Sequence, residues 1–70
     1  MELKVNGELK QYSESNLPLS EVLKRSGVEN LDLVSVQLNG EFVAAQDLTS
    51  TDAKNGDEVD FLFFMGGGAL

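Results

Sequence analysis

The first quarter of the chain alternates apolar and polar residues on both sides of an Asn-Gly pair. Residues 3–5 precede Asn6-Gly7, and residues 8–12 follow it. A period of two is typical of a half-buried strand. Asn-Gly fits a type I′ turn, because both central residues of that turn need positive φ. We therefore predict a hairpin with strands at about 2–6 and 8–12.

A helical pattern comes next along the chain. Leu19, Val22 and Leu23 recur at the spacing that places them on one face of a helix. A proline just before them suits the first turn, where its missing N–H leaves no hydrogen bond unmade. Gly27 is a typical stop signal. The pattern predicts a helix over 18–26.

The second half of the chain holds another hairpin and a final strand. The pair Asn39-Gly40 separates alternating runs at 34–38 and 41–44. The most apolar segment is 58–64, which we predict as the last strand. The remaining segments are predicted as polar loops or turns: 13–17, 46–54 (with one short helical turn) and 55–57.

The order of these elements is hairpin, helix, hairpin, loop and strand. One helix must cover one face of the sheet. This is the order of the β-grasp (ubiquitin-like) fold, an α+β fold with a mixed sheet of about five strands packed on one helix. That fold type, and not the periodicity, implies that the last strand lies between the first and the third. The predicted core comprises Leu3, Val5, Leu9, Leu19, Val22, Leu23, Val34, Val36, Leu38, Val59 and Phe61.

Composition narrows the function classes. The net charge of −7 disfavours nucleic acid and anionic membranes, since phosphate binding needs clustered Lys and Arg. It favours partners with a basic docking face. No apolar stretch is long enough to span a bilayer, and the first residues do not read as a signal peptide. We expect a cytoplasmic protein that is a monomer.

Catalytic side chains are scarce in this chain. It has no cysteine and no histidine, which excludes disulfides, Cys/His metal sites and most nucleophile–base pairs. The twelve carboxylates are scattered over polar positions, and nothing predicts a buried acid–base pair. We expect no catalytic residue, no metal site and no bound cofactor.

The exceptional feature is the end of the chain. Gly66, Gly67 and Gly68 follow the last predicted strand directly, and Ala69 and Leu70 come after them. Glycine lacks Cβ, so such a tail is thin and flexible enough to enter a narrow channel in another protein. We divide the chain into a domain at 1–65 and a tail at 66–70.

The last strand also predicts a contact surface. If residues 59, 61 and 63 face the helix, then Leu62 and Phe64 face away from it beside the tail. Exposed apolar side chains often mark a protein-binding surface. We predict a partner-binding surface at Leu62, Phe64 and Met65, with a loop that covers them as the alternative.

Three segments carry a resemblance to a known family. The V-x-L-N-G-E segment at 36–41, the N-G-D-E-V segment at 55–59 and the terminal glycines resemble the ThiS branch of the ThiS/MoaD sulfur-carrier family. The resemblance extends over nearly the whole chain. It implies a protein co-substrate and not an enzyme.

The resemblance implies a mechanism and partners. An E1-like adenylyltransferase of the ThiF/MoeB type uses ATP to adenylylate the C-terminal glycine. A sulfur donor enzyme then supplies the sulfur that displaces AMP, and the resulting thiocarboxylate passes sulfur to an acceptor synthase. In this chain the thiocarboxylate and adenylylation site would be Gly68.

The chain departs from the family at its end. Family members usually stop at Gly-Gly, whereas Ala69-Leu70 follow Gly68 here. Some relatives with such extensions are trimmed by a JAMM-type peptidase, so the resemblance implies a processing site at Gly68, Ala69 and Leu70.

The sulfur acceptor stays open between thiamine-type cofactor and amino-acid biosynthesis, molybdopterin or a tRNA base. The alternative functions are a noncovalent ubiquitin-like interaction module and a covalent protein modifier.

Overall fold

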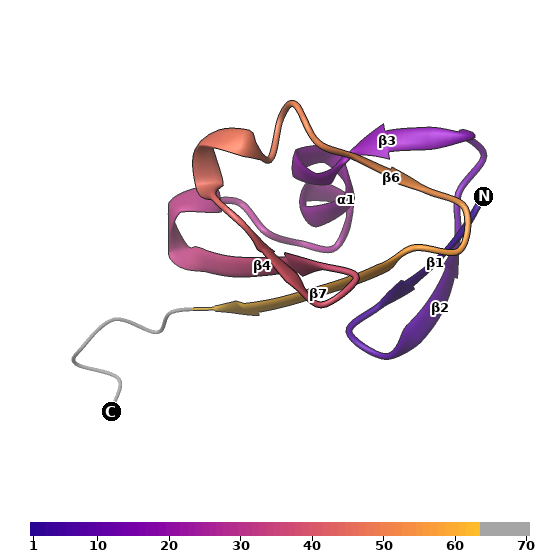
Figure 1. Ribbon diagram of the computed structural model, residues 1–70, viewed down its shortest axis with the longest axis horizontal. Coiled ribbons are helices and arrows are strands. Elements are labelled where there is room, and N and C mark those ends of the chain that lie inside the picture. Colours follow the sequence, from indigo (N-terminus) through magenta and orange to yellow (C-terminus); the bar gives the residue numbers. More distant parts are fainter. Residues whose placement is uncertain (64–70) are drawn as a thin grey trace.

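The structure, a computed structural model, describes residues 1–63. A sheet wraps one side of a short helix, and a small second sheet lies on the helix's other side (Figure 1). The elements in chain order are β1 (Glu2–Val5), β2 (Glu8–Gln11), β3 (Asn16–Pro18), α1 (Leu19–Arg25), β4 (Val34–Leu38), β5 (Glu41–Val43), β6 (Asp52–Lys54) and β7 (Glu58–Phe63), with short 3-10 helices at Leu31–Leu33 and Ala45–Asp47.

The main sheet has the strand order β2-β1-β7-β4-β5. The last strand, β7, lies between β1 and β4, as the fold type implied. β1 and β7 run parallel, and β7 and β4 run antiparallel. The predicted β-grasp fold, with a mixed five-stranded sheet packed on one helix, is therefore confirmed.

Both predicted Asn-Gly hairpins are present. Asn6 and Gly7 have φ values of 49° and 85°, and Asn39 and Gly40 have values of 53° and 86°. Positive φ at both central residues is the type I′ geometry, whose twist matches that of the two strands. The same turns bring two asparagine side chains up against β7.

Helix α1 ends where the sequence predicted. Gly27 has a φ of 97°, which residues with a Cβ rarely adopt. Its N–H donates to the carbonyl of Lys24 (3.1 Å), and the N–H of Val28 donates to the carbonyl of Leu23 (3.0 Å). These two bonds form a Schellman motif. Val28 is buried next to the helix end, so the stop also adds an apolar side chain to the core.

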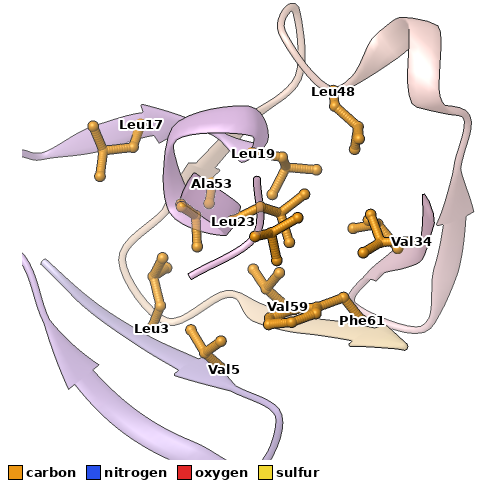
Figure 2. Packing of buried hydrophobic residues seen from close by; sticks show 13 residues of the cluster. Leu3, Val5, Leu17, Leu19, Leu23, Val34, Leu48, Ala53, Val59 and Phe61 are labelled. Carbon is orange, nitrogen blue, oxygen red and sulfur yellow. The ribbon is translucent and has the colours of Figure 1, made fainter. Parts of the chain in front are cut away.

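The core lies between the helix and the inner face of the sheet (Figure 2). Its buried residues are Leu3, Val5, Leu17, Leu19, Val22, Leu23, Val28, Val34, Val36, Leu48, Ala53, Val59 and Phe61. One predicted core residue is wrong: Leu9 is 66% exposed. Leu9 pairs with Lys4, which points away from the helix because its neighbours in β1 point inward. Leu38 packs against the core and is only partly buried.

The second sheet was not predicted. Part of the expected loop at 13–17 belongs to β3, which pairs antiparallel with β6. Leu17 and Ala53 lie opposite each other in this pair and are both buried. Leu48, which follows the second 3-10 helix, is fully buried as well. These strands of three residues are too short to show a period of two in the sequence.

Candidate functional site

β7 leads directly to the glycine tail, and its two halves differ in burial. Val59 and Phe61 are buried, whereas Leu62 is 74% exposed and Phe63 is 51% exposed. Phe63 pairs with buried Val34, so it lies on the helix side, as predicted, but at the margin of the core. Its ring packs edge-on against Phe61, with the ring centroids 5.8 Å apart. The predicted exposure of Leu62 is confirmed.

The remaining predicted site residues lie outside the part of the chain that the structure describes. They are Phe64, Met65, Gly66, Gly67, Gly68, Ala69 and Leu70. The boundary between domain and tail at residue 65 lies there too and stays a prediction. The structure therefore describes the strand that leads to the tail.

The outer face of the main sheet, defined as the face away from α1, carries three exposed apolar side chains. Leu9, Phe42 and Leu62 all point to this face, because each lies opposite an outward-facing residue of the neighbouring strand. They stand on three different strands with polar and charged positions between them. Among those charged positions are Glu58 and Asp60 of β7 and Lys4 of β1, which lies opposite Glu58. The outer face beside Leu62 is therefore partly apolar, with Asp60 as the charged residue nearest to it in β7.

Asn39 holds the start of β7. Its Oδ1 accepts from the N–H of Glu58 (2.9 Å), and its Nδ2 donates to Oδ1 of Asp57 (3.1 Å). Its backbone N–H donates to the carbonyl of Glu58 (2.7 Å). One turn residue thus makes two bonds to the first residue of β7 and one to the residue before it.

Asn6 holds the middle of β7 from the opposite side. Its backbone N–H donates to the carbonyl of Val59 (2.9 Å), and its Oδ1 accepts from the N–H of Phe61 (2.8 Å). The sequence predicts both asparagines as turn formers only. The Asn-Gly signal marks the turn, but their side-chain bonds depend on strand order, which local pattern does not contain.

A cluster of ion pairs among the described residues joins α1 to the segment before β3. Arg25 at the end of α1 donates to both carboxylate oxygens of Glu14 (3.0 and 2.7 Å) and to Glu21 (3.1 Å). The bonds from Arg25 lower the pKa of Glu14 from 4.5 to about 2, and the two carboxylates raise the pKa of Arg25. This cluster ties the segment before β3 to the helix.

Residues 1–63 contain no cluster of three potential metal ligands, and none of their helices has the length and apolar character needed to cross a bilayer. What the described chain offers is a strand that is bonded on both sides as far as Phe61 and that leads to the tail, beside a partly apolar outer face.

Comparison with known proteins settles the family. The model of the ThiS family matches residues 3–68 of the chain. The chain belongs to the ThiS family. The match spans nearly all of the chain and ends at Gly68, the glycine singled out as the modification site. The resemblance drawn from the three segments is therefore confirmed.

Solved structures agree with this family. The crystal structure of the thiamine biosynthesis protein ThiS from Geobacter metallireducens is 39% identical, with a TM-score of 0.83 over 97% of this chain and 100% of that one. An NMR solution structure of a thiamine biosynthesis protein from the same organism is also 39% identical, with a TM-score of 0.79 over 100% of this chain and 91% of that one. A comparison with curated proteins found no match.

Proposed function

We propose that this ThiS-family protein is a sulfur carrier in thiamine biosynthesis, with its working carboxylate on Gly68 after removal of Ala69-Leu70. The observation that carries the proposal is the family match over residues 3–68, which ends at Gly68. The related structures are of proteins named for thiamine biosynthesis, which supports the choice of pathway.

The chemistry requires an activated carboxylate. The Gly68 carboxylate attacks the α-phosphorus of ATP on a ThiF-type adenylyltransferase, and pyrophosphate leaves. The terminal sulfur of a donor persulfide then attacks the acyl carbon, and AMP leaves. A thiol reduces the resulting acyl disulfide, which yields the C-terminal thiocarboxylate. The carrier supplies the reacting carbonyl, while its partners supply ATP and the catalytic groups.

The two residues after Gly68 explain why processing belongs to the proposal. Ala69 follows Gly68 in the sequence, so the Gly68 carbonyl is part of a peptide bond. A JAMM-type peptidase that cleaves after Gly68 would release the carboxylate. A side chain at the reacting residue would crowd the narrow approach that glycine leaves open.

The described domain contributes docking and support. Leu62 and its same-face neighbour Asp60 offer an outer face suited to a partner with apolar and basic side chains. We place the docking of the adenylyltransferase on this face, together with Phe64 and Met65 from the sequence prediction.

The test compares two forms of the chain. Residues 1–68 and residues 1–70 are each mixed with the ThiF-type adenylyltransferase of the same organism and ATP, and pyrophosphate release and intact mass are followed. Only the 1–68 form should release pyrophosphate and gain an adenylyl group. A 1–68 form that stays unmodified, or a 1–70 form that reacts as well, would contradict the proposal.

The exposed Leu62 also favours a second candidate, a noncovalent interaction module. In that case, deletion of residues 66–70 should leave partner affinity unchanged, whereas a sulfur carrier should lose all reaction.

A further inference from the structure

The two strands beside β7, β1 and β4, pair with it over different lengths. β1 pairs with β7 only at Lys4–Glu58 and Val5–Val59. β4 pairs with β7 as far as Phe63. In Figure 1 the yellow end of β7 runs beside β4 and away from the hairpin of β1 and β2. Among the described residues, β7 beyond Val59 therefore has a strand partner on one side only.

The hydrogen bonds show which backbone groups face the open side. On the β1 side, the N–H of Asn6 donates to the carbonyl of Val59, and the Oδ1 of Asn6 accepts from the N–H of Phe61. On the β4 side, the carbonyl of Glu58 accepts from the N–H of Asn39. Backbone groups alternate sides along a strand. The carbonyl of Phe61 and the N–H of Phe63 therefore face the side that β1 has left. We call residues 61–63 on this side the open edge.

Asn6 closes the ladder where β1 turns away. Its Oδ1 stands where the next carbonyl of a continued β1 would be, and it satisfies the N–H of Phe61. No side chain or strand of the described residues continues that ladder to Phe63. The open edge starts at the carbonyl of Phe61, the residue whose N–H Asn6 caps.

The open edge lacks the features that usually protect strand edges. Natural edges are blunted by charges, proline or bulges, because unpaired N–H and C=O groups template pairing with another chain. Residues 61–63 are Phe-Leu-Phe, with no charge and no proline, and two of these side chains are exposed. An unprotected apolar edge is a site for strand addition.

Two surface hollows flank this edge. One opens on the outer face and is lined by Asn6, Ser35, Asp60, Phe61 and Leu62, among others. The other lies towards the helix, between the first hairpin and the end of α1, and also borders Asn6 and Phe61. An added strand sends alternate side chains to opposite faces, so its residues would enter the two hollows in turn.

We propose that the open edge accepts an extended segment of the ThiF-type adenylyltransferase as an added strand, with a basic or amide side chain over Asp60. This inference rests on the proposed function. A second copy of this chain is disfavoured as occupant, because both copies carry a net charge of −7. The adenylyltransferase must also bind the chain that follows Phe63, and the open edge lies on the residues directly before that chain.

A matched pair of variants tests the edge in the 1–68 form. Phe63→Pro removes the N–H that faces the open side and leaves the bonds to β4 intact, because that N–H is not part of the β4 ladder. Phe63→Ala loses the same ring and keeps the N–H. Binding to the adenylyltransferase should be about tenfold weaker for Phe63→Pro than for Phe63→Ala, the effect of one lost hydrogen bond. Equal urea midpoints would show that both variants fold alike.

Hydrogen exchange provides a second readout on the wild-type chain. The Phe63 amide should exchange rapidly in the free protein and slowly in the complex, while the Leu62 amide should be protected in both. Equal binding of the two variants, or no gain of protection at Phe63, overturns the edge while adenylylation of the wild type leaves the proposed function standing. A wild-type 1–68 form that the enzyme neither binds nor adenylylates overturns both.

Discussion

The two ends of β7 differ in burial and in strand pairing. At its start, Glu58 is bonded to Asn39 on one side, and the next residue, Val59, is fully buried. At its end, Leu62 and Phe63 are largely exposed, and β1 no longer runs alongside. The first part of β7 is bonded on both sides. The second part exposes its side chains, and we propose that a partner protein binds there.

Under the proposed function, this difference divides the labour within β7: its start anchors the strand in the domain, and its end meets the partner enzyme. The hydrophobic core and the two asparagines fix the direction in which the chain leaves the sheet. The exposed apolar side chains of Leu62 and Phe63 lie at the end of β7 that precedes the tail. Each prediction below tests this division by changing one end and not the other.

The largest effect should come from the tail. Gly68→Val in the 1–68 form adds a branched side chain at the reacting residue and leaves the core unchanged. We expect thiocarboxylate formation to fall by at least about a hundredfold, since small misplacement of a reacting group costs that much. The urea unfolding midpoint should match that of wild type. An active variant would show that the glycine is not the reacting residue.

Neighbouring residues of β7 should differ strongly in their effect on stability. Phe61→Ala removes a buried ring and should lower the free energy of unfolding by about 3 kcal/mol. Leu62→Ala changes an exposed side chain and should alter it by less than about 0.5 kcal/mol. Urea unfolding followed by circular dichroism measures both. Similar losses would mean that Leu62 is packed and that the outer face is covered.

A smaller effect is expected at the asparagine that caps the open edge. Asn6→Gly keeps the positive φ but removes the acceptor of the Phe61 N–H, at a cost of about 1 kcal/mol. Asn6→Ala also removes the acceptor and in addition forces a residue with a Cβ into positive φ, so it should cost about 1 kcal/mol more. The Phe61 amide should exchange faster in both variants. Unchanged exchange would show that the side-chain bond does not hold β7.

The smallest effect concerns the ion pair of Arg25 and Glu14, which makes no hydrogen bond to β7. The pKa of Glu14 in the folded chain is about 2, against an ordinary value of 4.5. A lowered carboxyl pKa adds stability that is present above the ordinary value and is lost as pH falls towards the folded value. Unfolding midpoints between pH 5 and 2 should therefore depend less on pH in Glu14→Gln than in wild type. The pair is exposed, so the difference should be small.

Much of the fold followed from local pattern. Asn6-Gly7, Asn39-Gly40 and Gly27 each require positive φ, so their turns and the helix stop were readable from the residues. The alternation of inward and outward positions along the last strand also predicted that Leu62 is exposed. Alternation failed for Leu9, because a short strand pattern does not say which of its two faces meets the helix.

The unpredicted features depend on contacts between distant segments. The pairing of β3 with β6 joins residues more than thirty positions apart in strands of three residues. The bonds of Asn6 and Asn39 to β7 require the last strand to lie between the other two hairpins. The candidate tail was visible in the sequence because three successive glycines need no tertiary contact to be noticed.

The most direct test of the central claim is the intact mass of the protein isolated from its native cells under demand for thiamine. The account predicts a chain that ends at Gly68, with a fraction that carries sulfur in place of one oxygen of the terminal carboxylate. A full-length chain that ends at Leu70 and carries no sulfur under these conditions would contradict it.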